Sequence, residues 1–243
     1  MKNCDTYIFD LYGTLIDIRT NEKSRRFWQA ISRYLASQGL YCHAGRLETD
    51  YLTSCRQESS LMAASHPDTL IEIDIANVFR TLYASHGINA DDQMIVSTAR
   101  AFRLLSLEKL QLYPKALEVL GEMRLSGKRV YLLSNAQKLF TEMEIDSLNL
   151  RSCFDGILYS SEAGVRKPDA RFFRLLLDRF DIDPARAIMI GNDYHDDILG
   201  AYQAGIASIY IPTAQSSRRN GALPENCRSI RKLSDLLSSD KDY

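Results

Sequence analysis

The sequence YIFDLYGTLID occupies residues 7–17. Its first three residues form a short apolar run that ends at the carboxylate of Asp10, and Gly13 and Thr14 follow closely. This pattern predicts a buried strand that delivers Asp10 to a tight loop. Ligands of open α/β sheets bind at the carboxyl ends of the strands. We therefore expect Asp10 to lie in a ligand site, the alternative being an aspartate that only terminates a strand, as turn residues do.

Helical periodicity replaces this pattern from Thr20 to about Leu110. Apolar residues at helical spacing predict one helix that ends near Gly39 and another that ends near Gly87. Two more helices are expected at about Leu47 to Ser65 and Asp91 to Ser106. The region is predicted to be an all-helical insert packed as a small bundle, with its aromatic residues in the bundle core.

Strands and helices alternate after Tyr113. The predicted strands are 129–133, 156–159, 187–190 and 208–211. The predicted helices are 116–125, one after Gln137, 169–180, about 197–204 and a short one near 233–237. Pro114 is expected in the first turn of the first of these helices. Residues 214–221 are predicted to be a loop. This alternation is typical of an α/β fold with a Rossmann-like parallel sheet flanked by helices. We expect a core domain of residues 1–17 and 111–243, and a helical cap domain of residues 18–110 over the carboxyl edge of the sheet.

The composition and net charge of the chain argue against binding to nucleic acid or to membranes. The chain has 243 residues, 45% of them hydrophobic and 25% charged, with a formal net charge of −1. A nearly neutral chain offers no electrostatic basis for binding nucleic acid or an anionic membrane. The apolar run before Asp10 is too short for a signal peptide or membrane span. Five scattered cysteines without CxxC spacing favour reduced thiols. We expect a cytoplasmic protein, monomeric or homodimeric, that binds neither nucleic acid nor membrane.

Two later segments carry groups suited to binding an anion. Leu133-Ser134-Asn135 ends the second core strand with a hydroxyl and an amide that can donate to phosphate oxygens, or else cap the next helix. In Gly164-Val165-Arg166-Lys167-Pro168-Asp169, Pro168 is predicted to open a helix and to hold the Lys167 ammonium at a loop-helix junction. A solvated surface lysine is the alternative interpretation.

A fourth segment, Ile190 to Ala201, contains three acids within five residues: Asp193, Asp196 and Asp197. Adjacent carboxylates are costly unless a positive charge neutralises them. Mg²⁺, which prefers oxygen ligands, suits such a cluster. A helix N-terminus that collects acids to suit its dipole is the alternative.

These four motifs, in this order across nearly the whole chain, resemble those of the haloacid dehalogenase superfamily of hydrolases. The resemblance implies that Asp10 is a nucleophile that forms an aspartyl-phosphate, and that Asp10 and the backbone carbonyl of Tyr12 bind Mg²⁺. Thr14 and Ser134 would bind the transferring phosphoryl group, and Lys167 would neutralise charge. The candidate residues are Asp10, Thr14, Ser134, Asn135 and Lys167 for catalysis, Tyr12, Gly13, Thr14, Ser134 and Lys167 for phosphate binding, and Asp10, Tyr12, Asn192, Asp193 and Asp197 for the metal.

Two positions depart from the pattern of phosphatases in this superfamily. Tyr12 stands where those enzymes carry a second aspartate that protonates the leaving group. A phenol, with a reference pKa of about 10, is a poor general base at neutral pH. Asn192 stands where the first acid of the fourth motif is expected, so either Asn192 or Asp193 would pair with Asp197.

We therefore expect a Mg²⁺-dependent phosphohydrolase that acts on a small phosphorylated metabolite. Tyr12 also fits the branch of 2-haloacid dehalogenases, which carry a similar D-x-Y-G-T-L and need no metal. The position six residues after Lys167, a tyrosine in those enzymes, is Phe173 here. A phosphate-binding protein that has lost most of its catalysis is the third hypothesis.

Overall fold

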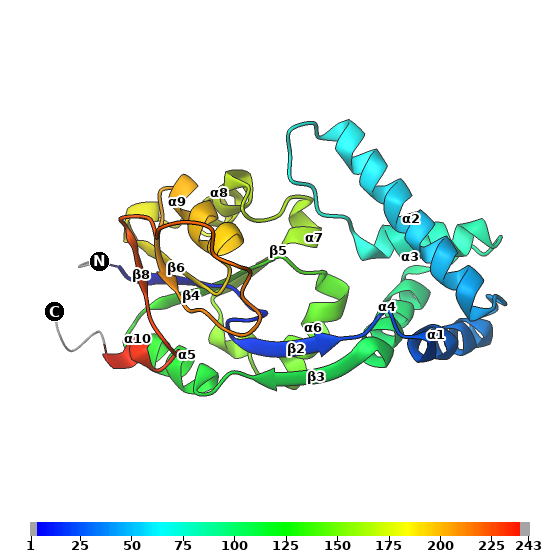
Figure 1. The fold of residues 1–243 in the computed structure, drawn as a ribbon, viewed down its shortest axis with the longest axis horizontal. Helices are drawn as coiled ribbons and strands as arrows, with labels where there is room; N and C mark the ends of the chain where they lie inside the picture. Colours follow the sequence, from blue (N-terminus) through cyan, green and yellow to red (C-terminus); the bar gives the residue numbers. More distant parts are fainter. Residues whose placement is uncertain (1–3, 239–243) are drawn as a thin grey trace.

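The computed structural model describes residues 4–238 (Figure 1). Its main sheet has six strands in the order β5 (Gly156–Tyr159), β4 (Arg129–Ser134), β1 (Thr6–Phe9), β6 (Ala187–Gly191), β7 (Ala207–Tyr210) and β8 (Cys227–Ser229). Every neighbouring pair is parallel. The predicted α/β class and the predicted core strands are confirmed, and β8 was not predicted.

The chain reverses its direction of winding at β1. This strand pairs with β4 on one side and with β6 on the other, and all four of its residues are buried. Such a reversal opens a crevice at the carboxyl ends of the strands, where ligands of this fold class bind. Asp10 follows β1 directly and so lies at the carboxyl end of the strand where the order reverses.

Side chains alternate between the two faces of the sheet, and each face has its own core. Phe9, Leu132 and Ile190 pack with helix α5 (Ala116–Leu125) on one face. Ile8, Leu133 and Met189 pack with helix α8 (Ala170–Arg179) on the other face. A strand buried on both faces reads as a continuous apolar run, which is why the sequence pattern identified these strands.

Four helices occur between the first and second core strands: α1 (Arg25–Ser37), α2 (Ala44–Ser65), α3 (Ile75–Ser85) and α4 (Asp92–Ser106), hereafter the helical insert. They group at one end of the molecule in Figure 1. Their shared core is rich in aromatic rings, and Phe102 stands 4.8 Å from Phe27 and 5.5 Å from Phe79 between ring centroids. The predicted helices and the predicted role of their aromatic residues are confirmed.

A two-stranded antiparallel ribbon joins the helical insert to the sheet. It consists of β2 (Ile16–Thr20) and β3 (Leu107–Leu112), with Ile16 opposite Leu112 and Ile18 opposite Leu110. The prediction of helix from residue 20 to residue 110 was therefore wrong at both ends. Each strand is short and half-exposed, and its partner lies about ninety positions away, so local periodicity gave no sign of the pairing.

Three other predictions need correction at element boundaries. Pro114 precedes α5, whose N-cap is Lys115 at φ 70°, and Pro168 precedes α8, whose N-cap is Asp169. The predicted helix 197–204 begins earlier, as a π-helical turn (Tyr194–Leu199) followed by α9 (Gly200–Gln203). Asp193 caps this turn and so moves its start.

The remaining short elements are α6 (Lys138–Ser147), α7 (Ser160–Ala163), α10 (Asp235–Ser238) and two 3₁₀ turns at Arg151–Cys153 and Pro184–Arg186. Residues 214–221 contain neither helix nor strand, as predicted. Within residues 4–238, none of the helices combines the length and the apolar character needed to cross a bilayer.

Candidate active site

The ends of three adjacent strands bring the first, second and fourth motifs together. Asp10 follows β1, Ser134 ends β4 and Asn192 follows β6, and these strands are neighbours in the order β4-β1-β6. Residues separated by more than 180 positions in the chain therefore meet at one edge of the sheet. Lys167 reaches the same point from the loop before α8.

Lys167 is the electrostatic centre of this site. Its Nζ lies 2.7 Å from Asp10 Oδ1 and 2.6 Å from Asp197 Oδ1, and it donates to the Leu133 carbonyl at 2.9 Å. The residue is only 1% exposed. Burial lowers the pKa of Lys167, but the two carboxylates outweigh burial and the pKa lies above its usual value. The side chain is therefore a buried ammonium, and the interpretation as a solvated surface lysine was wrong.

Two carboxylates share this one ammonium, which leaves an excess of negative charge. Asp197 is fully buried, and burial raises the pKa of its carboxyl above the usual value although Lys167 opposes the shift. A second buried carboxylate beside one cation is costly unless further positive charge arrives. The site is thus suited to an additional cation.

Thr14 links the loop after β1 to the fourth motif. Its hydroxyl lies 3.0 Å from Asp10 Oδ2 and 3.2 Å from Asn192 Oδ1, either of which can accept its single proton. Gly13 has φ +87°, and a Cβ there would lie 2.4 Å from Asn192 Nδ2. A side chain at residue 13 would therefore be strained and would displace Asn192.

Ser134 and Asn135 have different roles in the structure. The buried Ser134 hydroxyl has no hydrogen-bond partner among the described residues, which suits a group that waits for a ligand. Asn135 instead holds the Lys167 backbone, because its Oδ1 accepts from Lys167 N at 2.8 Å and its Nδ2 donates to Lys167 O at 3.1 Å. Its Nδ2 also donates to Asp196 Oδ2. Asn135 thus positions Lys167.

Asp193 and Asp197 of the fourth motif also have different roles in the structure. Asp193 Oδ1 accepts from the backbone N–H groups of His195 and Asp196, both at 2.9 Å, so this carboxylate caps the π-helical turn. Asp197 contacts Lys167, and its Oδ2 accepts from Asp193 N at 2.8 Å. A Cβ on Gly191 would lie 2.2 Å from Asp197 Oδ2, so glycine is needed for Asp197 to reach the site.

The donor set at this edge consists of oxygen atoms. Asp10 and Asp197 offer carboxylates, Asn192 offers an amide oxygen beside Thr14, and Tyr12 offers a backbone carbonyl in the same loop. Oxygen donors with an excess of negative charge suit a hard cation such as Mg²⁺. The residues present therefore fit the metal expected from the sequence, with the Asp193 carboxylate engaged in the turn.

The Tyr12 hydroxyl is engaged in a network that the sequence did not predict. It donates to the Glu144 carboxylate on α6 and lies 2.9 Å from Thr141 Oγ1. Arg103 Nη2, from α4 of the helical insert, lies 3.5 Å from the same hydroxyl, and Arg103 Nε lies 2.7 Å from Glu144 Oε1. Burial and the Glu144 carboxylate raise the pKa of Tyr12. Tyr12 therefore remains a neutral phenol and cannot serve as a general base.

Comparisons with known proteins agree with this geometry. The model of the haloacid dehalogenase-like hydrolase family matches residues 4–205. A glyceraldehyde 3-phosphate phosphatase of Methanothermobacter thermautotrophicus is 27% identical over 52% of this chain and 56% of its own length. The pyrophosphatase PpaX of Bacillus velezensis is 28% identical over 97% of this chain and 96% of its own. The chain thus matches about half the length of the first relative and nearly all of the second.

Solved structures share the fold. A 2-haloacid dehalogenase of Pseudomonas syringae pv. Tomato superposes with a TM-score of 0.66 at 22% identity, covering 97% of this chain and 99% of that one. At this identity the likeness shows the fold alone. The family match over most of the chain, on a parallel sheet with Asp10, Ser134 and Lys167 at its carboxyl edge, shows that the chain belongs to the haloacid dehalogenase-like hydrolases.

Proposed function

We propose that this protein is a Mg²⁺-dependent phosphohydrolase that cleaves a small phosphorylated metabolite through an aspartyl-phosphate at Asp10. The observation that carries the proposal is the meeting of three groups at one sheet edge: the Asp10 carboxylate, the buried Lys167 ammonium and the Ser134 hydroxyl, which has no hydrogen-bond partner within residues 4–238. The relatives named as phosphatase and pyrophosphatase support phosphate as the group transferred.

Each residue then has a defined task. A carboxylate oxygen of Asp10 attacks phosphorus, and the bond from phosphorus to the leaving oxygen breaks with its electron pair on oxygen, which gives the aspartyl-phosphate and the leaving group as an oxyanion that takes any proton it needs from solvent. Lys167 stabilises the negative charge on Asp10 and on the phosphoryl group, while the Ser134 and Thr14 hydroxyls donate to phosphoryl oxygens. Water then attacks the phosphorus of the aspartyl-phosphate, releases inorganic phosphate and regenerates Asp10.

Mg²⁺, held by Asp10, Asp197, Asn192 and the Tyr12 carbonyl, would supply the positive charge that the two carboxylates and the phosphoryl group lack. The described site supports this assignment because its acids outnumber its ammonium group. Asp193 stays outside the proposed ligand set because its carboxylate caps the turn.

Tyr12 sets the expected substrate chemistry. Its hydroxyl donates a hydrogen bond to Glu144 and its pKa is raised, so it is a poor acid for protonating a leaving group. Acyl and aryl phosphates, whose leaving groups need little protonation, should therefore turn over faster than alkyl phosphates. Equal rates on both classes would show that another acid serves the leaving group.

We also propose the division expected from the sequence, with a core of residues 1–17 and 111–243 and a cap of residues 18–110. The ribbon β2–β3 joins the two, and Arg103 of the helical insert reaches the Tyr12 hydroxyl and the Glu144 carboxylate beside the nucleophile loop. The cap would exclude water and select the substrate.

All five cysteines are free thiols, which supports a reducing cytoplasm. The proposed activity is compatible with either a monomer or a homodimer.

A 2-haloacid dehalogenase is the second candidate, favoured by Tyr12 in the first motif. In that reaction Asp10 would attack carbon and displace halide. Phe173, six residues after Lys167, is fully buried in the core against the sheet and carries no hydroxyl. This residue weighs against the dehalogenase reaction. A phosphate-binding protein with weak catalysis is the third candidate, supported by Tyr12 and Asn192.

One panel of substrates separates these candidates. Purified protein and Asp10→Asn are assayed on an aryl phosphate, an acyl phosphate and an L-2-haloacid, with Mg²⁺ and with chelator. The proposal predicts phosphate release that needs both Asp10 and Mg²⁺. Halide release in the presence of chelator would favour the dehalogenase, and no turnover of any substrate would favour the binding protein.

A further inference from the structure

A second cluster of ligating side chains lies in the helical insert. Cys42 from the loop between α1 and α2, Asp50 from α2 and His86 at the end of α3 each offer one ligand atom, and these atoms lie within 4.8 Å of one another. All three residues are half-buried, so they are held in place yet reachable from solvent. Among the histidines, cysteines and acids of residues 4–238, no second group of three meets this criterion.

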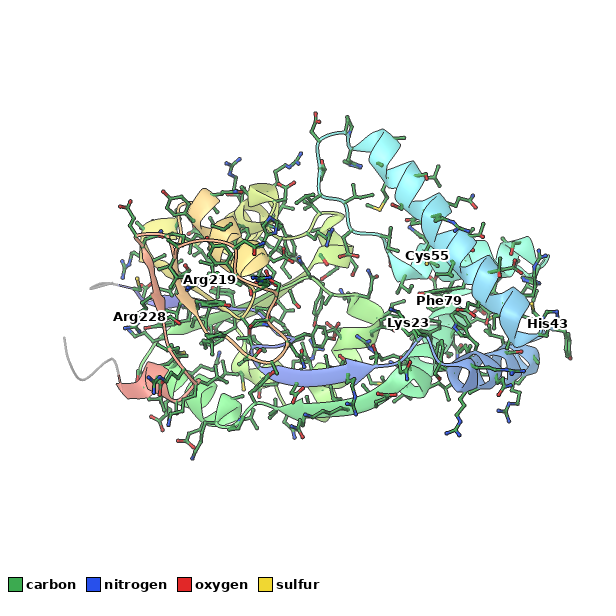
Figure 2. All side chains as sticks on the ribbon, viewed as in Figure 1. Lys23, His43, Cys55, Phe79, Arg219 and Arg228 are labelled. Atoms are coloured by element: carbon green, nitrogen blue, oxygen red, sulfur yellow. The ribbon has the colours of Figure 1, made fainter. Side chains whose placement is uncertain are left out.

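The cluster is separate from the site that contains Asp10. In Figure 2 the labelled His43, the neighbour of Cys42 in the chain, lies at the outer end of the helical insert, on the side away from the sheet. None of the three residues is assigned to the proposed phosphohydrolase site. Their juxtaposition is therefore independent of the proposed function.

The distances suit a tetrahedral metal of zinc's size. Zn²⁺ binds imidazole nitrogen and carboxylate oxygen at about 2.0–2.1 Å, which places two such ligand atoms about 3.3 Å apart. His86 Nε2 and Asp50 Oδ2 are already 3.1 Å apart, as a hydrogen-bonded pair whose shared proton the metal would replace. Thiolate binds Zn²⁺ at about 2.3 Å, so its sulfur should lie about 3.6 Å from the other two atoms. The cluster needs to contract by little more than about 1 Å, which rotation of the Cys42 side chain in its loop can supply.

We propose that Cys42, Asp50 and His86 bind Zn²⁺. A thiolate and an imidazole select a borderline transition metal over Mg²⁺, which prefers oxygen. Binding releases the Cys42 thiol proton to solvent, and the charges of thiolate and carboxylate then balance the divalent ion. The three residues line a cavity of about 570 Å³ together with Thr53 and Thr81, and this cavity has room for a water molecule as the fourth ligand.

Arg46 is the group with which the metal must compete. Its Nε lies 2.8 Å from Asp50 Oδ1 and 2.9 Å from Asp50 Oδ2. The Arg46 side chain is 67% exposed, so it can withdraw to solvent at little cost. Asp50 can then turn Oδ2 toward the metal on the His86 side. Zn²⁺ would tie the α1–α2 loop to α2 and α3 and stabilise the insert.

Cobalt substitution tests this site without relying on activity. Metal-free protein is titrated with Co²⁺ and then Zn²⁺ in excess Mg²⁺, and absorbance of the cobalt-thiolate charge-transfer band is followed. None of the residues assigned to the phosphohydrolase site is a cysteine, so the band reports on a cysteine-containing site alone. We expect the band to saturate at one equivalent of Co²⁺ per chain and to disappear when Zn²⁺ is added. The band should be absent in Cys42→Ser. It should be retained in Cys153→Ser, in which a half-buried cysteine of the core is replaced.

A chelator competition measures the affinity. His86→Gln should weaken Zn²⁺ binding by at least about tenfold, since even residues that only orient zinc ligands change affinity by about 10–100-fold. His66→Gln, at the exposed end of α2, should leave the affinity unchanged. Circular dichroism of the metal-free variants checks that they are folded.

Alkylation provides a measurement on the unmodified sequence. Zn²⁺ should protect Cys42 from iodoacetamide, mapped by mass spectrometry, while Cys153 reacts at the same rate with and without metal. The proposal is overturned if the cobalt band is missing or survives Cys42→Ser, if His86→Gln and His66→Gln bind Zn²⁺ equally well, or if Zn²⁺ leaves the alkylation rate of Cys42 unchanged.

Discussion

Replacement of Arg103 by methionine tests how the helical insert is fixed to the core. Arg103 Nε and Glu144 Oε1 are 2.7 Å apart, and the two side chains are 11% and 1% exposed. The guanidinium also lies over the Phe140 ring, 4.9 Å from its centroid. Methionine keeps much of the apolar contact with this ring, and it removes the ion pair together with the longer contact from Nη2 to the Tyr12 hydroxyl.

The expected cost follows from the geometry. At an effective dielectric constant of about 20, unit charges at this separation attract by about 6 kcal/mol. Both ions lost hydration when they were buried, so the net loss on removing one partner is smaller, about 3–5 kcal/mol. A domain of ordinary stability has about 5–15 kcal/mol in total, so the effect should be large. The double variant Arg103→Met with Glu144→Gln should lose about 1–3 kcal/mol less free energy of unfolding than the sum of the losses of the two single variants.

The pH dependence of this cost has a definite sign. Burial raises the pKa of Glu144, and Arg103 opposes that shift. Without Arg103 the pKa of the folded protein rises further above the unfolded value of about 4.3. A carboxyl with a raised folded pKa stabilises the fold below the unfolded pKa, and this contribution is lost as pH rises through the folded pKa. Arg103→Met should therefore be less destabilising at pH 5.5 than at pH 7.5, by about 1–2 kcal/mol.

Urea unfolding measures these quantities. Trp28, the single tryptophan, is buried in the helical insert and reports its unfolding by fluorescence, and circular dichroism follows the whole chain. Arg100→Met, on the exposed face of the same helix, is the matched control and should cost less than about 0.5 kcal/mol. A cost for Arg103→Met no larger than that of the control, or one that grows as pH falls, would refute the reasoning.

Three further predictions concern the candidate active site. Lys167→Met should lower kcat by at least about 100-fold, since it removes a charge that stabilises the transition state; retained turnover in a steady-state assay would contradict this. Ser134→Ala should lower kcat/KM by about 10–100-fold and leave the melting temperature unchanged, because its hydroxyl has no partner to lose among residues 4–238; a clear drop in melting temperature with normal kinetics would assign it a structural role. Gly191→Ala should displace Asp197 and destabilise the fold by about 1–3 kcal/mol, seen in urea unfolding with a parallel loss of activity; an unaffected variant would show that Asp197 need not pack against this backbone.

The loops that carry the candidate site residues were predictable because their signals are local. An apolar run followed at once by Asp10, or by Ser134, encodes both the strand and the polar group at its end, and adjacent parallel strands bring these ends together. The order of motifs along the chain then led to the family, which the match over residues 4–205 shows.

The remaining features depend on contacts between distant segments. The pairing of β2 with β3 and the contact of Tyr12 with Glu144 join positions that no local pattern connects. The role of Asp193 was ambiguous for a different reason. A carboxylate at the start of a helical turn can cap the turn or face the site, and only its hydrogen bonds to the following backbone N–H groups distinguish the two.

In the proposed reaction, Asp10 becomes phosphorylated during turnover. The most direct measurement is rapid acid quench of the protein with an acyl phosphate and Mg²⁺, followed by borohydride reduction and peptide mapping by mass spectrometry. We expect modification of residue 10 in the native sequence and none in Asp10→Asn, which should also be inactive. Phosphate release without any modification at Asp10, or turnover that persists in Asp10→Asn, would contradict the account.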